Sequence, residues 1–97
     1  MGEEGKNALH EAIYATNIDI VNFLMIKGAE PTILTIDDYT PLQLAIVNQS
    51  SEIACTLLEQ KLTDINQNTS HGTALHLAVS LSDTKAVQLL LKNEADL

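Results

Sequence analysis

The sequence has few aromatic residues, a single cysteine and few basic residues, and each shortage narrows what the protein can be. Two tyrosines and one phenylalanine are its only aromatic residues, so the core must be aliphatic, which suits packed helices and repeat stacks. Because Cys55 is the only cysteine, no disulfide can form within the chain, and a reducing compartment is expected. The apolar periodic stretch around Cys55 predicts a buried, inert thiol.

Basic residues are scarce as well: five stand against 13 acidic residues, which gives a net charge of −8 at pH 7. Nucleic-acid binding normally needs a basic surface that displaces counterions from phosphates, and the same charge disfavours anionic membranes. No apolar run approaches the ~20 residues of a membrane span, and "MGEEGKN" lacks the pattern of a secretory signal. We therefore expect an intracellular protein, cytoplasmic or nuclear, that binds no nucleic acid and does not insert into membranes.

What the sequence does contain is a repeat with a period of 33 residues. When the chain is shifted by this interval, small apolar and aliphatic residues fall on one another in every copy. The matched sets are Leu9, Leu42 and Leu75; Ala12, Ala45 and Ala78; Ile13, Ile46 and Val79; Val21, Ala54 and Val87; Leu24, Leu57 and Leu90; and Met25, Leu58 and Leu91. This pattern predicts three stacked units, none of which can bury its apolar face alone.

Each copy has the spacing of two short helices. In the third copy, apolar residues at i, i+3 and i+4 form one helical face, the segment "SLSD" interrupts the pattern, and Ser82 or Asp83 can cap a second helix. The first copy repeats this arrangement with Asn17 as the candidate cap, and Gly28 suits the end of its second helix because glycine adopts the left-handed conformation easily. The chain is therefore predicted to be all-α.

The segments that recur at these positions resemble the ankyrin repeat. "EGKNALH", "DDYTPLQ" and "SHGTALH" are similar to its turn and Thr-Pro-Leu-His segment, and "IVNFLMIKGAEPT" and "AVQLLLKNEADL" are similar to the end of its second helix. The resemblance covers residues 5–97 and implies one domain, 1–97, with repeats at about 3–34, 35–67 and 68–97. The fold that it implies is an ankyrin-repeat solenoid of stacked helix-turn-helix units joined by β-turn loops.

The chain departs from the family pattern at several turns. Asp38 and His71 replace the turn glycine, and both residue types tolerate the left-handed region better than most. Lys61 and Glu94 stand where the family has a glycine at a helix end, and the loop "QNTSHG" is one residue short, which predicts an altered turn. Both terminal repeats are apolar and the chain ends within the motif "EADL", so we expect a piece of a longer array that can self-associate through its uncapped ends.

The histidines are the first candidates for chemistry, and their context favours a scaffold role. His10 begins the segment "HEAIY", which lacks the second histidine of a zinc-protease motif, and His76 lies two repeats away. Gln43, a poor metal ligand, occupies the equivalent position in the second repeat. By resemblance, these side chains hold the turns by hydrogen bonds; the matching hydroxyl positions are Thr40 and Thr73, with Asn7 in the first repeat. We expect no catalytic, metal-binding or cofactor-binding residue and no enzyme activity.

The resemblance also implies a surface for a protein partner, formed by the turn tips and the exposed, concave side of the first helices. The candidate partner-binding residues are Tyr14, Leu34, Ile36, Asp37, Tyr39, Val47, Asn48 and Leu81. An apolar patch rimmed by polar groups is typical of an interaction site, and tyrosine is a favoured anchor. The alternative for Leu34 and Ile36 is that they pack against the neighbouring turn and cover the core.

The function implied by the resemblance is that of a non-catalytic protein–protein interaction module. An alternative is an accessory region, for targeting or regulation, of a larger multidomain enzyme or ligand-binding protein. A further feature is the segment "LEQKLTDIN", which resembles the context of asparagine hydroxylation in ankyrin repeats, with Leu58 upstream of the target Asn66. The alternative is that Asn66 only satisfies backbone groups of the turn.

Overall fold

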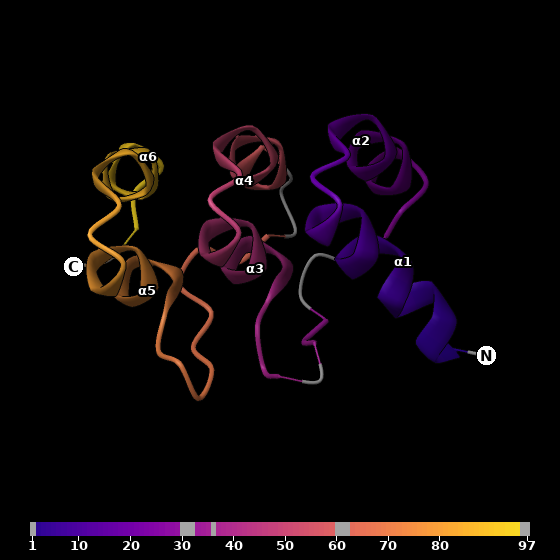
Figure 1. Cartoon of the computed structure of the whole chain (residues 1–97), viewed down its shortest axis with the longest axis horizontal. Helices are drawn as coiled ribbons and strands as arrows, with labels where there is room; N and C mark the ends of the chain where they lie inside the picture. The colour runs from indigo at the N-terminus through magenta and orange to yellow at the C-terminus, as the bar shows by residue number, and fades with distance from the viewer. Residues whose placement is uncertain (1, 30–32, 36, 60–62, 96–97) are drawn as a thin grey trace.

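The computed structural model describes residues 2–29, 33–35, 37–59 and 63–95, and six helices lie within these ranges. They are α1 (Gly2–Tyr14), α2 (Ile18–Ile26), α3 (Pro41–Val47), α4 (Ser51–Leu58), α5 (Ala74–Ser80) and α6 (Thr84–Lys92). Consecutive helices pair, and the three pairs stand side by side (Figure 1). The all-α fold is thus confirmed; in the described ranges β-type pairing is limited to one isolated bridge between Thr69 and Gly72.

The helix pairs build two layers. The first helices, α1, α3 and α5, form one layer, the second helices, α2, α4 and α6, form the other, and the loops before α3 and α5 project beyond the first layer (Figure 1). Helix α3 contacts both α1 and α5, and α4 contacts both α2 and α6. Each unit therefore packs only against its neighbours, as expected for a solenoid.

Aliphatic residues at the repeat spacing fill the space between the layers. Ala12, Ala45 and Ala78 are at most 5% exposed, and a single methyl group at each of these positions leaves room for helices to approach closely. The larger core side chains include Leu9, Ile13, Val21, Leu42, Ile46, Ile53, Leu57 and Leu90. The core is aliphatic, as the shortage of aromatic residues predicts.

Side-chain caps fix where the helices begin. The hydroxyl groups of Thr40 and Thr73 accept hydrogen bonds from the backbone N–H three residues later, and each closes a capping box with Gln43 or His76. Asn17 caps α2 as predicted, and Asp83, one of the two candidates, caps α6. These caps satisfy N–H groups that have no partner inside the helix.

Left-handed residues recur where each first helix turns into the second. Thr16, Gln49 and Ser82 have φ values of 57°, 58° and 55° and lie 33 residues apart. No glycine stands at any of these positions, so each turn stores some backbone strain. The strain is largest at Thr16, because its branched Cβ is the least compatible with positive φ.

The predictions for the other turns are confirmed in part. Gly28 and Asp38 have positive φ values of 95° and 68°, as expected, and Glu94 has a positive φ of 70° at the position of the family glycine. His71 does not: the following residue, Gly72, takes the left-handed conformation instead, with φ of 86°. Lys61 lies outside the described residues.

Two other predictions are wrong. The segment "EGKN" was expected to form a turn, but α1 runs through it from Gly2. The role suggested for Asn7 stays a prediction, because its side chain is outside the description. Cys55 is exposed rather than buried, since it occupies the outward-facing position of α4, as the exposed Asn22 and Gln88 do in the equivalent helices.

Candidate interaction face

His10 and its equivalent Gln43 tie the first repeat to the second and the second to the third. The Nε2 atom of His10 donates to the carbonyl of Ile33 at 3.0 Å, and Nε2 of the buried Gln43 donates to the carbonyl of Gly72 at 2.8 Å. The Oε1 atom of Gln43 also accepts from Thr69 Oγ1 at 3.1 Å. These contacts support the predicted scaffold role, since the groups that a reaction would need are used to hold the loops.

A second set of contacts joins the tips of the two projecting loops. The ring of Tyr39 stacks on the imidazole of His71, with centroids 4.1 Å apart and planes within 7°. Nε2 of His71 donates to the carbonyl of Asp37 at 2.7 Å, and Ser70 Oγ donates to the Asp38 carboxylate at 3.2 Å. The two tips are therefore one connected surface, and His71 is a member that the sequence analysis had read only as a turn residue.

Some candidate partner-binding side chains are exposed to solvent, and others pack against the protein itself. Tyr14, Leu34, Val47 and Leu81 are 55%, 40%, 36% and 43% exposed, and Asp37 is exposed as well. Tyr39 is half-buried against the core and His71, so it supports the surface as well as forming part of it. Ile36 lies outside the described residues, and its role stays a prediction.

Asn48 is a structural residue of this face. Its Nδ2 group donates to the carbonyl of Ile13 at 2.9 Å and lies 3.4 Å from the carbonyl of Tyr14. Both carbonyls belong to the last turn of α1, where helical carbonyls lack intrahelical partners. Asn48 thus links the end of α3 to the end of α1 and places Val47 beside the neighbouring repeat.

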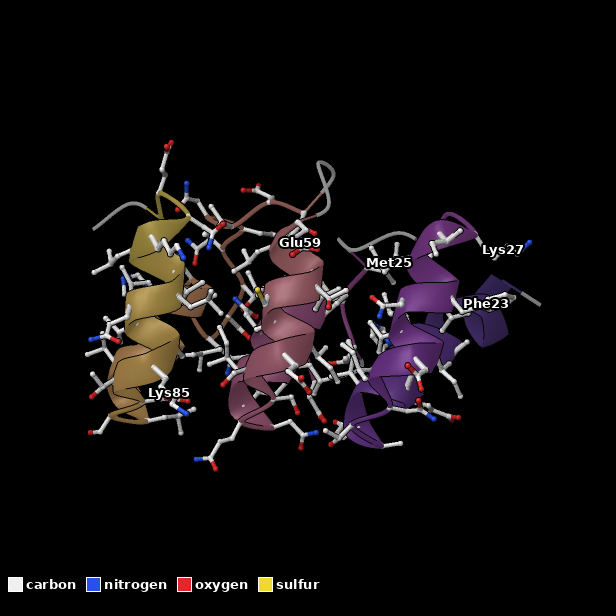
Figure 2. The ribbon with its side chains drawn as sticks, turned by 90° about the horizontal axis from the view of Figure 1, so that it is seen from above. Phe23, Met25, Lys27, Glu59 and Lys85 are labelled. Atoms are coloured by element: carbon white, nitrogen blue, oxygen red, sulfur yellow. The ribbon has the colours of Figure 1, made fainter. Side chains whose placement is uncertain are left out.

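We use the name interaction face for the surface formed by Tyr14, Leu34, Asp37, Asp38, Tyr39, Val47 and Leu81. Its charged members are Asp37 and Asp38, both of them acidic and exposed. The lysines with described side chains, Lys27, Lys85 and Lys92, belong to the second helices or their ends; Lys27 and Lys85 are labelled in Figure 2. Among the described side chains, the interaction face therefore combines exposed apolar groups with negative charge only.

The other candidate sites offer less chemistry. Within the ranges that the structure covers, no three His, Cys, Asp or Glu side chains come together as metal ligands. A crevice beside Ser50, Ala54, Asp83 and Leu89 is large enough only for water. The buried Ser50 hydroxyl, which has no protein partner in the described part of the chain, suits such a water.

Asn66 lies in a tight turn between the second and third repeats. Its backbone N–H donates to Asp64 Oδ1 at 3.0 Å, and the N–H of Gln67 donates to the carbonyl of Asp64 at 3.1 Å. The Asn66 side chain is exposed. Asp64 therefore forms an Asx turn that places Asn66 at the surface.

Comparison with known families identifies the fold. The family model described as ankyrin repeats (3 copies) matches residues 9–97. The chain belongs to the ankyrin repeat family.

Known relatives show how varied the proteins are that contain this kind of unit. Over 98% of its length the chain is 32% identical to human transient receptor potential cation channel subfamily A member 1, and over 95% it is 34% identical to alpha-latrotoxin-Lg1a of the spider Latrodectus geometricus. Over 99% it is 32% identical to an ankyrin repeat protein of fowlpox virus. The chain spans only 9%, 7% and 22% of these three proteins, so what it shares with them is the repeat array.

The relatives also bear on the expected compartment. One is a cation channel and another is a toxin, so membership of the family does not fix where the protein acts. Of the six helices described, none is both long and apolar enough to cross a membrane.

Proposed function

We propose that this chain is a non-catalytic module that binds a protein partner through its interaction face. Ankyrin repeats are generally protein-interaction modules, and the chain belongs to that family. The observation that supports the proposal is the exposure of Tyr14, Val47 and Leu81 at the C-terminal ends of the first helices, together with the joined loop tips. Exposed apolar side chains rimmed by polar groups are typical of binding sites.

The charge of the interaction face indicates what the partner segment offers. Asp37 and Asp38 are exposed on this face, and the whole chain carries a net charge of −8. Opposite charge speeds association and excludes acidic competitors. The partner segment therefore presents apolar side chains flanked by lysine or arginine.

Affinity capture with matched variants tests the proposal. The wild-type protein and a Tyr14→Ser/Val47→Ser variant are immobilised and exposed to the same lysate, with Gln88→Ser on α6 as the control. We expect the double variant to lose partners that the wild type and the control retain, because only the double variant changes the interaction face. Capture that is equal in all three would contradict the proposal, provided that circular dichroism shows equal folding.

Salt supplies a second readout in the same experiment. A complex that joins the acidic rim to a basic segment weakens as ionic strength rises, because exposed charges beyond ~10 Å are screened at 0.1 M salt. Elution of the captured partner by salt below 0.5 M would agree with this. If the partner stays bound in high salt but is not captured by the Tyr14→Ser/Val47→Ser variant, the interaction face binds the partner without a contribution from charge.

For Asn66 we propose hydroxylation as a modification of this array. The support is its exposed position in the turn after Asp64 and the resemblance of "LEQKLTDIN" to such sites. Mass spectrometry of the protein from its native host would show a gain of one oxygen on the peptide that contains Asn66. An unmodified peptide would leave Asn66 with the backbone role alone.

A further inference from the structure

The two joined loop tips present an aromatic ring to solvent. Tyr39 covers one face of the His71 imidazole, with the two ring planes within 7° of each other. His71 is nevertheless exposed, and among the described residues no aromatic or cationic side chain lies against its other face. The imidazole is therefore a flat, open surface that is backed by a second ring.

Hydrogen bonds fix the orientation of this ring. The Nε2–H of His71 donates to the carbonyl of Asp37 at 2.7 Å, and the backbone N–H of His71 donates to Thr69 Oγ1 at 3.1 Å. Because a carbonyl can only accept, the neutral imidazole carries its proton on Nε2. A ring whose orientation is fixed before binding loses little conformational entropy when a ligand stacks on it.

Acidic groups lie beside the ring. The Asp38 carboxylate accepts from Oγ of Ser70, the residue that precedes His71, at 3.2 Å, and Asp37 is the residue whose carbonyl binds the ring. Both aspartates are exposed. The chain contains no arginine, and its residues 28–60 and 62–84 contain no lysine, so neither loop tip contains a lysine or arginine of its own.

We propose that the tip site, formed by Asp37, Asp38, Tyr39 and His71, binds an arginine side chain of the partner. The guanidinium group stacks on the open face of His71 and directs its N–H groups to the carboxylates. Guanidinium suits both contacts, because it is planar, weakly hydrated and able to pair with carboxylates while it stacks on a ring. The inference rests on the proposed function, since it names the side chain that the partner brings to the interaction face.

Other ligands suit the tip site less well. The ammonium group of lysine is a compact, strongly hydrated charge without a flat face, so it would pair with the carboxylates but would not cover the ring. A nucleobase could stack on His71, but its phosphates would be repelled by Asp37 and Asp38. An aromatic side chain would stack without using the carboxylates.

Peptide titrations test the tip site with defined probes. Three acetylated peptide amides differ only at one central position, which is arginine, lysine or citrulline; citrulline has the shape of arginine without its charge. Binding is followed by amide NMR of the labelled protein. We expect the arginine peptide to bind about three to ten times more tightly than either of the others, because only arginine combines stacking with charge. Equal binding of the arginine and lysine peptides, or of the arginine and citrulline peptides, would overturn the proposal.

Two variants separate the ring of His71 from its hydrogen bond. His71→Phe keeps a ring that can stack on Tyr39 and loses the Nε2 donor, whereas His71→Asn keeps a donor and loses the ring. We expect the preference for arginine over lysine to persist in His71→Phe and to disappear in His71→Asn, with Gln88→Ser on α6 as the unchanged control. The proposal is wrong if His71→Asn keeps the preference, or if His71→Phe loses it while circular dichroism shows an intact fold. It is also wrong if the arginine peptide shifts no amide of residues 37–39 or 69–72.

Affinity capture separates this proposal from the proposed function. If His71→Asn retains every partner that Tyr14→Ser/Val47→Ser loses, the interaction face binds the partner without the tip site, and the present inference is wrong. If Tyr14→Ser/Val47→Ser loses no partner while the wild-type protein still prefers the arginine peptide, the tip site stands and the role proposed for Tyr14 and Val47 is wrong.

Discussion

The ring of Tyr39 lies flat against the imidazole of His71, with the ring centroids 4.1 Å apart. This contact joins two loops that are otherwise 32 residues apart in the sequence, and the bond from His71 Nε2 to the Asp37 carbonyl holds it in place. The loop tips are thereby fixed relative to each other before any partner arrives. A preorganised surface loses less conformational entropy on binding.

The stack predicts energetic coupling between its two residues. Tyr39→Ala should lower the free energy of unfolding by about 2 kcal/mol, because the half-buried ring also packs against the core. In a double-mutant cycle with His71→Ala, the coupling should be about 0.5–1.5 kcal/mol. Urea denaturation of the four proteins measures it, and strictly additive effects would show that the stack contributes nothing.

Gln43 is fully buried and joins two loops, so its replacement should be costly. Gln43→Leu fills the same space but leaves the Thr40 N–H without its partner, and it removes one donor from the Gly72 carbonyl, which still accepts from the Thr69 N–H. We expect a loss of about 2–4 kcal/mol in the free energy of unfolding. Gln43→His should recover at least half of that loss, because His10 makes the equivalent contact; equal losses would mean that these hydrogen bonds do not matter.

The strained turn at Thr16 offers a stabilising substitution. Thr16 has φ of 57°, and glycine adopts this conformation without the clash of a branched Cβ. Thr16→Gly should raise the free energy of unfolding by about 0.5–1 kcal/mol. Thr84→Gly, at the start of α6, is the matched control and should lower it. Thermal unfolding of both variants measures these effects. If Thr16→Gly also lowers the free energy of unfolding, the backbone at Thr16 is not strained.

Cys55 should react as an exposed thiol. Its side chain is solvent-accessible on α4, so a disulfide reagent such as Ellman's should label one thiol per folded chain. The rate should be within about tenfold of that in urea, since no burial slows the approach. A labelling rate in the folded protein that is several orders of magnitude lower than in urea would show that the thiol is buried, as the sequence predicts.

Much of the fold could be predicted from the sequence because the determinants are local and repeated. The 33-residue spacing of apolar residues fixes which faces are buried, and the side chains of Thr40, Thr73 and Asn17 cap their helices through groups only a few residues away. Single-residue properties that depend on helix register were less predictable. Cys55 lies in an apolar stretch, yet a rotation of one residue from buried Ala54 places it outside.

The interaction face was predictable in outline and not in its internal contacts. Exposure of Tyr14, Val47 and Leu81 follows from their position after each buried helical stripe. The stack of Tyr39 on His71 and the link from Asn48 to Ile13 join different repeats. Contacts of that kind depend on how neighbouring repeats are placed relative to each other, so they cannot be predicted from a local sequence pattern.

The most direct test of the central claim is amide NMR of the labelled protein while a captured partner segment is added. The account predicts that the largest shift changes fall on Tyr14, Asp37, Val47 and Leu81, and that exposed residues of the second helices, Asn22, Cys55 and Gln88, stay unchanged. Changes confined to the second helices, with the interaction face unaffected, would contradict it.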